Sequence, residues 1–374
     1  MKNSLIYVTQ PSLPALEELE PYLKDIWDRK CLTNNGHYHQ LFEEALCEYL
    51  GVKYVSLFCN GTIAILAGLK ALNIAGEVIT TPFTFVATTH SLKWSGITPV
   101  FCDIEQNTCN IDSDKIENLI TENTKAILPV HVYGNPCNVE KIRCIADKYN
   151  LKVFYDAAHA FGVKYKEQPI GCFGNITMLS FHATKIFNTF EGGALVTNDS
   201  ELKNKIDKIK NFAFENETTI SGLGINGKMN EFQAALGFIQ LKYIDAYIAK
   251  NKKIAEIYRN GLEDIPGIRF LDNIEYARLN YSYFPIFVDA KLYGINRDEL
   301  YSKLKGYSIH TRRYFFPLIS NLKIYNDLPS SRIGNLPVAN KISEEVLCLP
   351  IYPDLCLTEV DRILKIISAN MGRL

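Results

Sequence analysis

Hydrophobic residues between positions 54 and 200 fall into short runs that are separated by longer segments of mixed polarity. The runs are rich in β-branched and aromatic residues, which favour strands, and they cover residues 54–58, 77–81, 99–103, 126–132, 152–156, 176–181 and 194–197. The intervening residues 63–72, 112–120 and 139–149 have the character of helices. Because parallel strands need crossover connections, this alternation predicts an α/β fold with a mostly parallel sheet flanked by helices. In such sheets ligands bind beyond the carboxyl ends of the strands.

The pattern changes after residue 229, where apolar residues recur at helical spacing over residues 231–262 and predict one long helix. Beyond it, residues 281–288 resemble a strand, and residues 297–304 and 357–367 resemble helices. We therefore expect a large domain over residues 1–245 and a smaller α+β domain over residues 246–374. The first ~30 residues are candidates for packing on the small domain.

Charge and cysteine usage narrow the classes of function. The 374 residues carry 40 Lys and Arg against 41 Asp and Glu, a net charge of −1, so no overall field attracts nucleic acid or an anionic membrane. Residues 1–10 lack the apolar core of a secretory signal, and no segment approaches the ~18 apolar residues of a membrane span. We expect a cytoplasmic protein. The ten cysteines are scattered without a Cys-x-x-Cys pair, which favours reduced cysteines and no metal site.

Candidate chemistry follows three of the predicted strands. Asn60, Gly61 and Thr62 come after the first strand and open an apolar helix. A small polar turn at a helix N-terminus can bind phosphate through backbone N–H groups, although the same residues suit an ordinary N-cap. Asp156 ends a second strand, where it could hold a proton on a cationic ring or be a loop aspartate with local partners. Lys185 lies beyond a third strand among apolar residues, so it is either a carbonyl-condensing amine of lowered pKa or a solvated surface charge.

Taken together, these residues resemble the DegT/DnrJ/StrS family of nucleotide-sugar aminotransferases. These are pyridoxal-phosphate enzymes of fold type I, with a mostly parallel seven-stranded sheet in the large domain. The resemblance extends over most of the chain, through residues 32–36, 60–62, 81–88, 130–134, 156–162, 180–193, 226–231 and 349–353. Each segment is weak alone, but their ordered combination is specific.

The resemblance implies a role for each matching residue. Lys185 matches the lysine that binds the cofactor covalently, Asp156 the partner of the ring nitrogen, and Phe85 the aromatic residue stacked on the ring. The resemblance also implies that the phosphate is bound by Gly61, Thr62, Ser180 and, from the second subunit of a homodimer, Asn226. His159 stands where many relatives have Gln, and it can still donate to the phenolic oxygen of the cofactor. Lys228 stands where many have Arg, so a bidentate contact is not expected there.

The family also implies the reaction. L-Glutamate first leaves its amino group on pyridoxal 5'-phosphate, which becomes pyridoxamine 5'-phosphate, and this amine then passes to C-3 or C-4 of a dTDP-linked keto-6-deoxyhexose. Such amino sugars serve O-antigen or similar surface polysaccharides. Arg312 and Arg313 are candidates for binding a diphosphate or carboxylate, or are surface arginines, while Tyr133 and His182 are candidates for bordering the sugar. Two alternatives are a cofactor-dependent sugar dehydratase, against which the presence of Lys185 counts, and a non-catalytic regulator that binds the cofactor.

Overall fold

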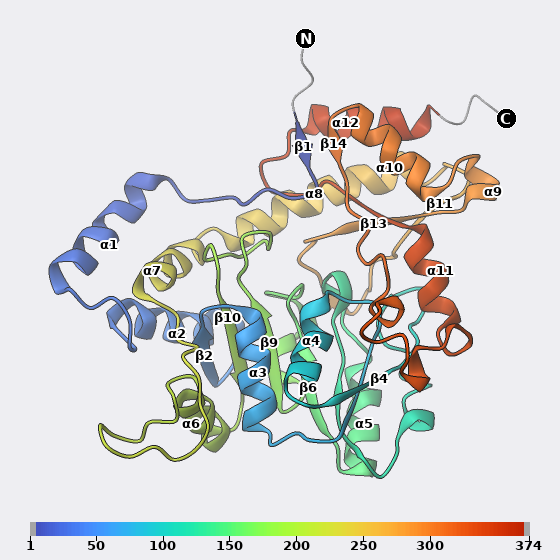
Figure 1. Ribbon diagram of the computed structural model, residues 1–374. Coiled ribbons are helices and arrows are strands. Elements are labelled where there is room, and N and C mark those ends of the chain that lie inside the picture. The colour runs from blue at the N-terminus through green and yellow to red at the C-terminus, as the bar shows by residue number, and fades with distance from the viewer. Residues whose placement is uncertain (1–4, 370–374) are drawn as a thin grey trace.

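The centre of the molecule is a seven-stranded sheet in the computed structural model, which describes residues 5–369 (Figure 1). In spatial order its strands are β2 (Tyr54–Phe58), β10 (Gly193–Thr197), β9 (Ile176–Ser180), β6 (Lys152–Asp156), β5 (Thr124–Leu128), β3 (Glu77–Thr80) and β4 (Thr98–Phe101). Strand β10 pairs antiparallel with both neighbours, whereas β9, β6, β5, β3 and β4 pair in parallel. The α/β fold with a mostly parallel seven-stranded sheet is confirmed.

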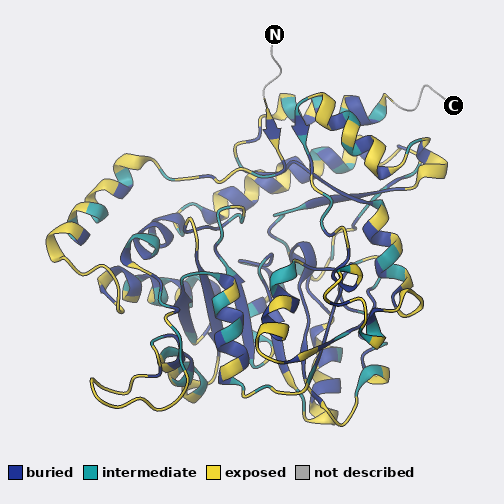
Figure 2. Ribbon diagram, viewed as in Figure 1, coloured by how far each residue is buried: buried dark blue, intermediate teal, exposed yellow. Residues whose placement is uncertain are grey.

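Helices cover both faces of this sheet, because successive side chains of each strand point to opposite faces. Phe154, Met178 and Leu195 pack in one core with the helices α3 (Gly61–Ala71), α4 (Val86–Trp94) and α6 (Ser200–Ile209). Tyr155 and Leu179 pack in the opposite core with α2 (His37–Leu50), α5 (Val139–Tyr149) and α7 (Glu231–Gln240). Figure 2 shows the strands of the central sheet mostly dark blue, as buried, whereas the surrounding helices also carry intermediate and exposed residues. Burial on both faces explains why the strands are continuous apolar runs.

The C-terminal third forms a second, antiparallel sheet of β11 (Ile268–Phe270), β13 (Phe284–Val288) and β15 (Val346–Leu349). Its helices are α8 (Ile244–Leu262), α9 (Ala290–Tyr293), α10 (Arg297–Gly306), α11 (Pro337–Glu345) and α12 (Leu357–Ser368). Near the N-terminus, β1 (Ile6–Tyr7) pairs in parallel with β14 (Ile309–His310), and α1 (Leu16–Arg29) contacts α7. A small sheet joins β7 (Lys164–Tyr165), β8 (Gln168–Pro169) and β12 (Ala277–Arg278). The division into domains at residues 245 and 246 stays a prediction.

The helix expected over residues 112–120 is wrong. The segment contains only a short 3-10 helix, Glu117–Leu119. The Asp112 side chain accepts a hydrogen bond from the backbone N–H of Asp114, and Lys115 forms ion pairs with Asp103 and Asp112. The Asp112 backbone N–H donates to the carbonyl of Asp103, and Lys115 and Leu119 donate to carbonyls three residues earlier, so the segment forms turns beside Asp103 rather than a continuous helix.

The single helix expected over residues 231–262 is also wrong, because the chain turns between α7 and α8. Lys242 and Tyr243 donate their backbone N–H groups to the carbonyls of Ile239 and Gln240, three residues earlier. The turn lets α7 contact α1 and α2 while α8 contacts α12 and β11 (Figure 1). The spacing of apolar residues does not reveal such a turn, because each of the two helices has a buried side and therefore the same helical spacing.

Within residues 5–369, no helix is both long and apolar enough to span a membrane. The same described residues contain no group of three or more His, Cys, Asp or Glu side chains positioned to hold a metal ion. The segment 1–10, considered above for a secretory signal, lies partly outside the described residues.

Candidate active site

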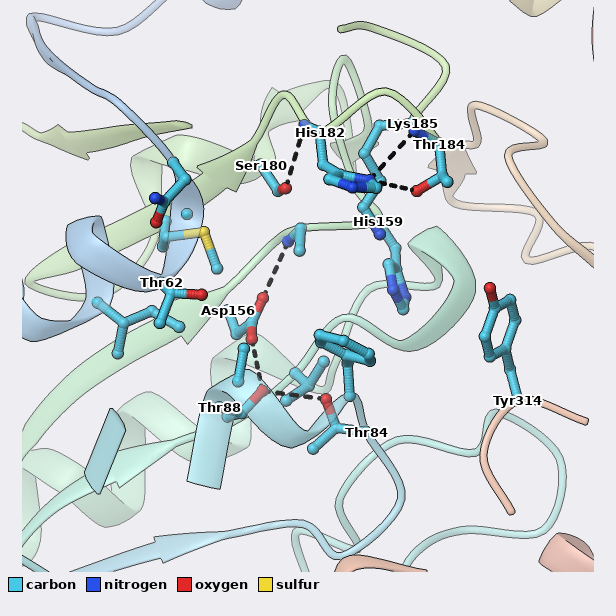
Figure 3. Close-up of a pocket in the computed structure, with 18 of the residues that line it drawn as sticks. Thr62, Thr84, Thr88, Asp156, His159, Ser180, His182, Thr184, Lys185 and Tyr314 are labelled. Atoms are coloured by element: carbon cyan, nitrogen blue, oxygen red, sulfur yellow. Dashed lines mark hydrogen bonds between the residues drawn. The ribbon is translucent and has the colours of Figure 1, made fainter. Parts of the chain in front are cut away.

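A cavity of about 230 Å³ opens at the carboxyl ends of β2, β6 and β9. Its walls come from the turns after these strands, from the start of α4, and from the C-terminal residues Tyr283, Tyr314 and Phe315. Figure 3 shows Asp156 and Lys185 approaching the same space from different strands. The sheet topology therefore places the candidate residues where ligands bind in parallel α/β folds.

Asp156 is the last residue of β6, and its side chain is 4% exposed. Thr88 Oγ1 donates to Asp156 Oδ2 at 2.7 Å, and the Ala158 backbone N–H donates to Oδ1 at 3.0 Å. Thr84 Oγ1 lies 3.1 Å from Thr88 Oγ1 and extends this chain of hydroxyl groups. Burial raises the pKa of the Asp156 carboxyl, whereas these two donors and the nearby Lys185 amine lower it. A buried carboxylate held in this way suits a cationic partner in the cavity.

Lys185 lies in the connection between β9 and β10, and its Nζ donates to the Tyr283 hydroxyl at 3.0 Å. Burial lowers the pKa of the Lys185 amine to about 8, although Asp156 and Tyr314 oppose this shift. Compared with an ordinary lysine of pKa about 10.4, such an amine has roughly 200 times as much of its neutral form at about pH 7. A neutral amine is the form that condenses with a carbonyl group.

His159 is neutral and has a defined tautomer. The backbone N–H of Tyr133 donates to His159 Nδ1 at 3.1 Å, so the ring hydrogen is on Nε2. Tyr133 provides this donor from the left-handed backbone region, with φ of 58°. Burial keeps the pKa of His159 well below its ordinary value, and its ring is nearly parallel to that of Phe315 at 5.8 Å. His159 therefore offers a single neutral N–H donor.

The first turn of α3 faces the same cavity through Gly61 and Thr62. The Asn60 side chain caps the helix by accepting from the Ile63 backbone N–H at 2.9 Å. The first N–H groups of a helix have no intrahelical partner and attract anions. A Cβ on Gly61 would lie 3.5 Å from Ser180 Oγ, so the glycine leaves room between the helix end and this hydroxyl. The arrangement suits a phosphate group.

The cavity brings together eight of the residues predicted from the sequence: Gly61, Thr62, Phe85, Asp156, His159, Ser180, His182 and Lys185. Four predicted residues do not line it. Tyr133 packs behind His159, with nearly parallel rings 6.4 Å apart. Asn226 pairs with Asn211 in the loop after α6. Arg312 is exposed beside Tyr314, and Arg313 forms a 2.8 Å ion pair with Asp298.

Sequence reasoning missed Thr88, Tyr283 and Glu191, which also line the cavity. Thr88 falls in the segment that resembles the family, but its partner Asp156 lies 68 residues later in the chain. Tyr283 contacts a residue 98 positions earlier, and no local pattern reports such a contact. Glu191 Oε1 lies 3.4 Å from His182 Nε2 at the mouth of the cavity.

Solved structures that resemble this one include sugar aminotransferases. The structure superimposes with a TM-score of 0.94 on DesI, solved in the presence of its TDP-sugar product, at 34% identity over 99% of this chain and 94% of that one. It superimposes with a TM-score of 0.92 on PseC of Helicobacter pylori, an aminotransferase involved in the biosynthesis of pseudoaminic acid, at 30% identity over 99% of this chain and all of that one.

The family model for DegT/DnrJ/EryC1/StrS aminotransferases matches residues 15–368, and the chain belongs to this family. A dTDP-4-amino-4,6-dideoxy-D-glucose transaminase of Escherichia coli is 50% identical over 99% of this chain and 100% of its own length. The family expected from the sequence motifs is confirmed, as is the enzyme class.

Proposed function

We propose that this protein is a pyridoxal 5'-phosphate-dependent transaminase that moves the amino group of L-glutamate onto C-4 of a dTDP-linked 4-keto-6-deoxyhexose. The observation that carries the proposal is the full-length 50% identity to a transaminase named for the dTDP-4-amino-4,6-dideoxy-D-glucose product. Among the two carbons left open by the sequence, that name favours C-4, and it favours the gluco epimer. The enzyme would make this product in the cytoplasm, and the product would serve the biosynthesis of O-antigen or another surface polysaccharide.

The cavity residues fit the cofactor at each of its polar groups. Asp156 would hold the ring nitrogen in its protonated form, and the neutral N–H of His159 would donate to the phenolic oxygen. Phe85 would cover one face of the ring. The phosphate would be bound by Gly61, Thr62 and Ser180, with the pyridoxamine form held by the same contacts. When bound, the cofactor supplies a sink for the electrons released when a C–H bond next to nitrogen breaks.

The contribution of the protein is to place one amine beside that C–H bond. Lys185 Nζ would bind the cofactor covalently in the resting enzyme and, once displaced by a substrate amine, would take the proton from the substrate carbon. An amine of pKa about 8 suits this task, because an effective general base has a pKa near the working pH. Asp156 stays ionised and fixes the orientation of the ring, which matters because a displacement of about 1 Å can reduce a rate ~100-fold.

We propose a homodimer with an active site at the subunit interface, completed by Asn226 of the second subunit. The chain exposes large apolar side chains on α1 and on the loop after α6, where Trp27 is 70% and Leu223 is 73% exposed. Asn226 closes the same loop, three residues after Leu223. Large exposed apolar side chains of this kind support an interaction surface that includes the loop of Asn226.

The substrate contacts belong to the mouth of the cavity. His182, paired with Glu191, is proposed to border the sugar, with Tyr133 acting behind it through His159. Arg312 is exposed beside the cavity residue Tyr314 and is proposed to bind a carboxylate or diphosphate. Arg313 already has an ion-pair partner, so we expect a smaller contribution from it.

The test is the conversion of paired 3-keto and 4-keto dTDP-6-deoxyhexoses in the presence of glutamate, with the product position read by NMR. We expect amination at C-4. When glutamate is added without sugar, we expect the absorbance of the pyridoxal form to disappear. Neither result should be seen with Lys185→Ala. Amination at C-3 would overturn the position. Loss of a sugar hydroxyl without amination would indicate the dehydratase. A protein whose cofactor absorbance does not change when glutamate is added would indicate the regulator.

A further inference from the structure

Tyr283 places its hydroxyl on the amine of Lys185, although nothing in the sequence motifs assigns it a role. The Nζ to Oη distance is 3.0 Å, and Nζ lies 5.6 Å from the centre of the tyrosine ring. Tyr283 precedes β13 and belongs to the C-terminal part of the chain. The contact therefore connects the candidate catalytic amine to a wall of the cavity that the seven-stranded sheet does not supply.

A phenol suits an amine that changes its protonation state. A neutral phenol has one O–H donor and also acceptor lone pairs, so it can accept from an ammonium group and donate to a neutral amine. Burial raises the pKa of the Tyr283 hydroxyl, so the phenol keeps its proton around neutral pH. The same contact can therefore persist while the lysine gains and loses a proton.

The ring of Tyr283 is held by its neighbours. Its centre lies 4.6 Å from the ring of His159, 5.7 Å from that of Tyr133 and 6.0 Å from that of Tyr314. The titratable groups that act on the amine are Asp156, Tyr314 and the neutral His159, besides Tyr283 itself. Among these groups, Tyr283 is the one whose hydroxyl forms a hydrogen bond with Nζ in the described structure.

We propose that Tyr283 is a further catalytic residue, which holds the Lys185 amine whenever that amine is free of the cofactor and keeps it aimed during its proton transfers. The proposal rests on the proposed function. As Nζ takes the proton of the substrate carbon, an N–H bond forms and a C–H bond breaks, and the electron pair of that C–H bond stays with the carbon and is stabilised by the cofactor. With the cofactor bound, Nζ would give up this proton again later in the same half-reaction and return to its neutral form. Tyr283 keeps its own O–H bond throughout.

The first experiment measures the lysine without the cofactor. In cofactor-free protein, the pH profile of reductive methylation of Lys185 by formaldehyde and cyanoborohydride, followed by mass spectrometry of the peptide, reports the pKa of the amine. Hydrogen bonds to charged groups are stronger than those to neutral groups, so Tyr283→Phe loses more from the ammonium than from the neutral amine. We expect the pKa of Lys185 to fall by about one unit, a tenfold change in the ammonium ratio.

Tyr314→Phe is the matched control, because it removes a neighbouring phenol of the same cavity. Tyr314 raises the pKa of the Lys185 amine through charge rather than through a hydrogen bond, so this variant should lower the lysine pKa by less than Tyr283→Phe does. In the second experiment, rapid mixing with glutamate measures the first half-reaction. We expect Tyr283→Phe to slow this step at saturating glutamate by about tenfold or more, with unchanged cofactor affinity and KM, and to increase the isotope effect of α-deuterated glutamate.

Equal lysine pKa values and equal half-reaction rates in Tyr283→Phe and the wild type would overturn the proposal. If Tyr283→Phe does not fold, 3-fluorotyrosine incorporated at position 283 keeps the shape of the ring and acidifies the phenol. The proposal then predicts a lower lysine pKa, and an unchanged value would overturn it. A wild-type protein that binds no cofactor would instead refute the proposed function, while the methylation profile would still report whether Tyr283 contacts the amine.

Discussion

Removing the Thr88 hydroxyl should change the affinity of the cofactor in a pH-dependent way. Thr88→Val deletes one of the two hydrogen bonds to the Asp156 carboxylate, the 2.7 Å bond to Oδ2, and keeps the 3.0 Å bond from Ala158 to Oδ1. A hydrogen bond to a charged group contributes about 1.5–3 kcal/mol and one to a neutral group about 0.5–1.5 kcal/mol. The ionised carboxyl therefore loses roughly 1–1.5 kcal/mol more than the protonated carboxyl, which raises the pKa of Asp156 by about one unit.

The sign of the effect follows from the charge that the cofactor needs. A protonated ring nitrogen requires an ionised Asp156, so the affinity falls as the pH drops through the pKa of this carboxyl. That pKa is already raised by burial, and Thr88→Val should shift the acidic limb about one unit further upward. At a fixed pH on this limb, the dissociation constant should rise about tenfold.

The assay is a titration of cofactor-free protein with pyridoxal 5'-phosphate between about pH 5 and pH 9, followed by absorbance. Other groups that titrate in this range contribute equally to all variants, so the difference between profiles isolates Asp156. Thr88→Ser keeps the hydroxyl and is the matched control, whose limb should coincide with that of the wild type. Coincident profiles for Thr88→Val and the wild type would refute the reasoning about the hydrogen bond.

Three further predictions concern the other contacts of the cofactor. The rate at which wild-type protein captures pyridoxal 5'-phosphate should rise with pH and level off above about 8, the pKa to which burial lowers the Lys185 amine; a midpoint near that of free lysine, about 10.4, would contradict this. Gly61→Val should weaken cofactor binding about tenfold or more, because a side chain there meets Met178 Sδ at 3.2 Å from its Cβ and narrows the phosphate site, and crowding of the buried Met178 should also lower the melting temperature of the cofactor-free protein; an unchanged dissociation constant would argue against that site. Asn226→Ala should speed the loss of cofactor on dialysis while sparing the fold, and full activity in a demonstrated monomer would refute a site shared between subunits.

Local sequence patterns predicted the elements of the sheet because each of its strands is short and buried on both faces. The run 152–156 coincides with β6, and the run 54–58 coincides with β2. The same reasoning failed at residues 112–120, where contacts with Asp103, from the Asp112 backbone and the Lys115 side chain, hold the segment in turns and a short 3-10 helix. It also missed the turn at residues 241–243, since two helices with similar buried faces have the period of one.

The residues of the candidate site that belong to sequence motifs were predictable. Asp156, Lys185 and Gly61 each follow a strand, and the topology of a parallel sheet brings such positions to one edge. Thr88 and Tyr283 lie 68 and 98 residues from the groups that they contact. Their contacts depend on the packing of distant segments, and one sequence alone does not encode that packing in any periodic signal.

The separation between Lys185 and Tyr283 has a consequence for the biogenesis of the enzyme. Tyr283 is the 98th residue that a ribosome adds after the lysine it contacts, and Phe315, which packs beside His159, comes later still. Until that part of the polypeptide has emerged, the cavity at the carboxyl ends of the strands lacks the wall formed by Tyr283 and Phe315. Loading of the vitamin-derived group with native affinity is therefore a late event, after translation is nearly complete.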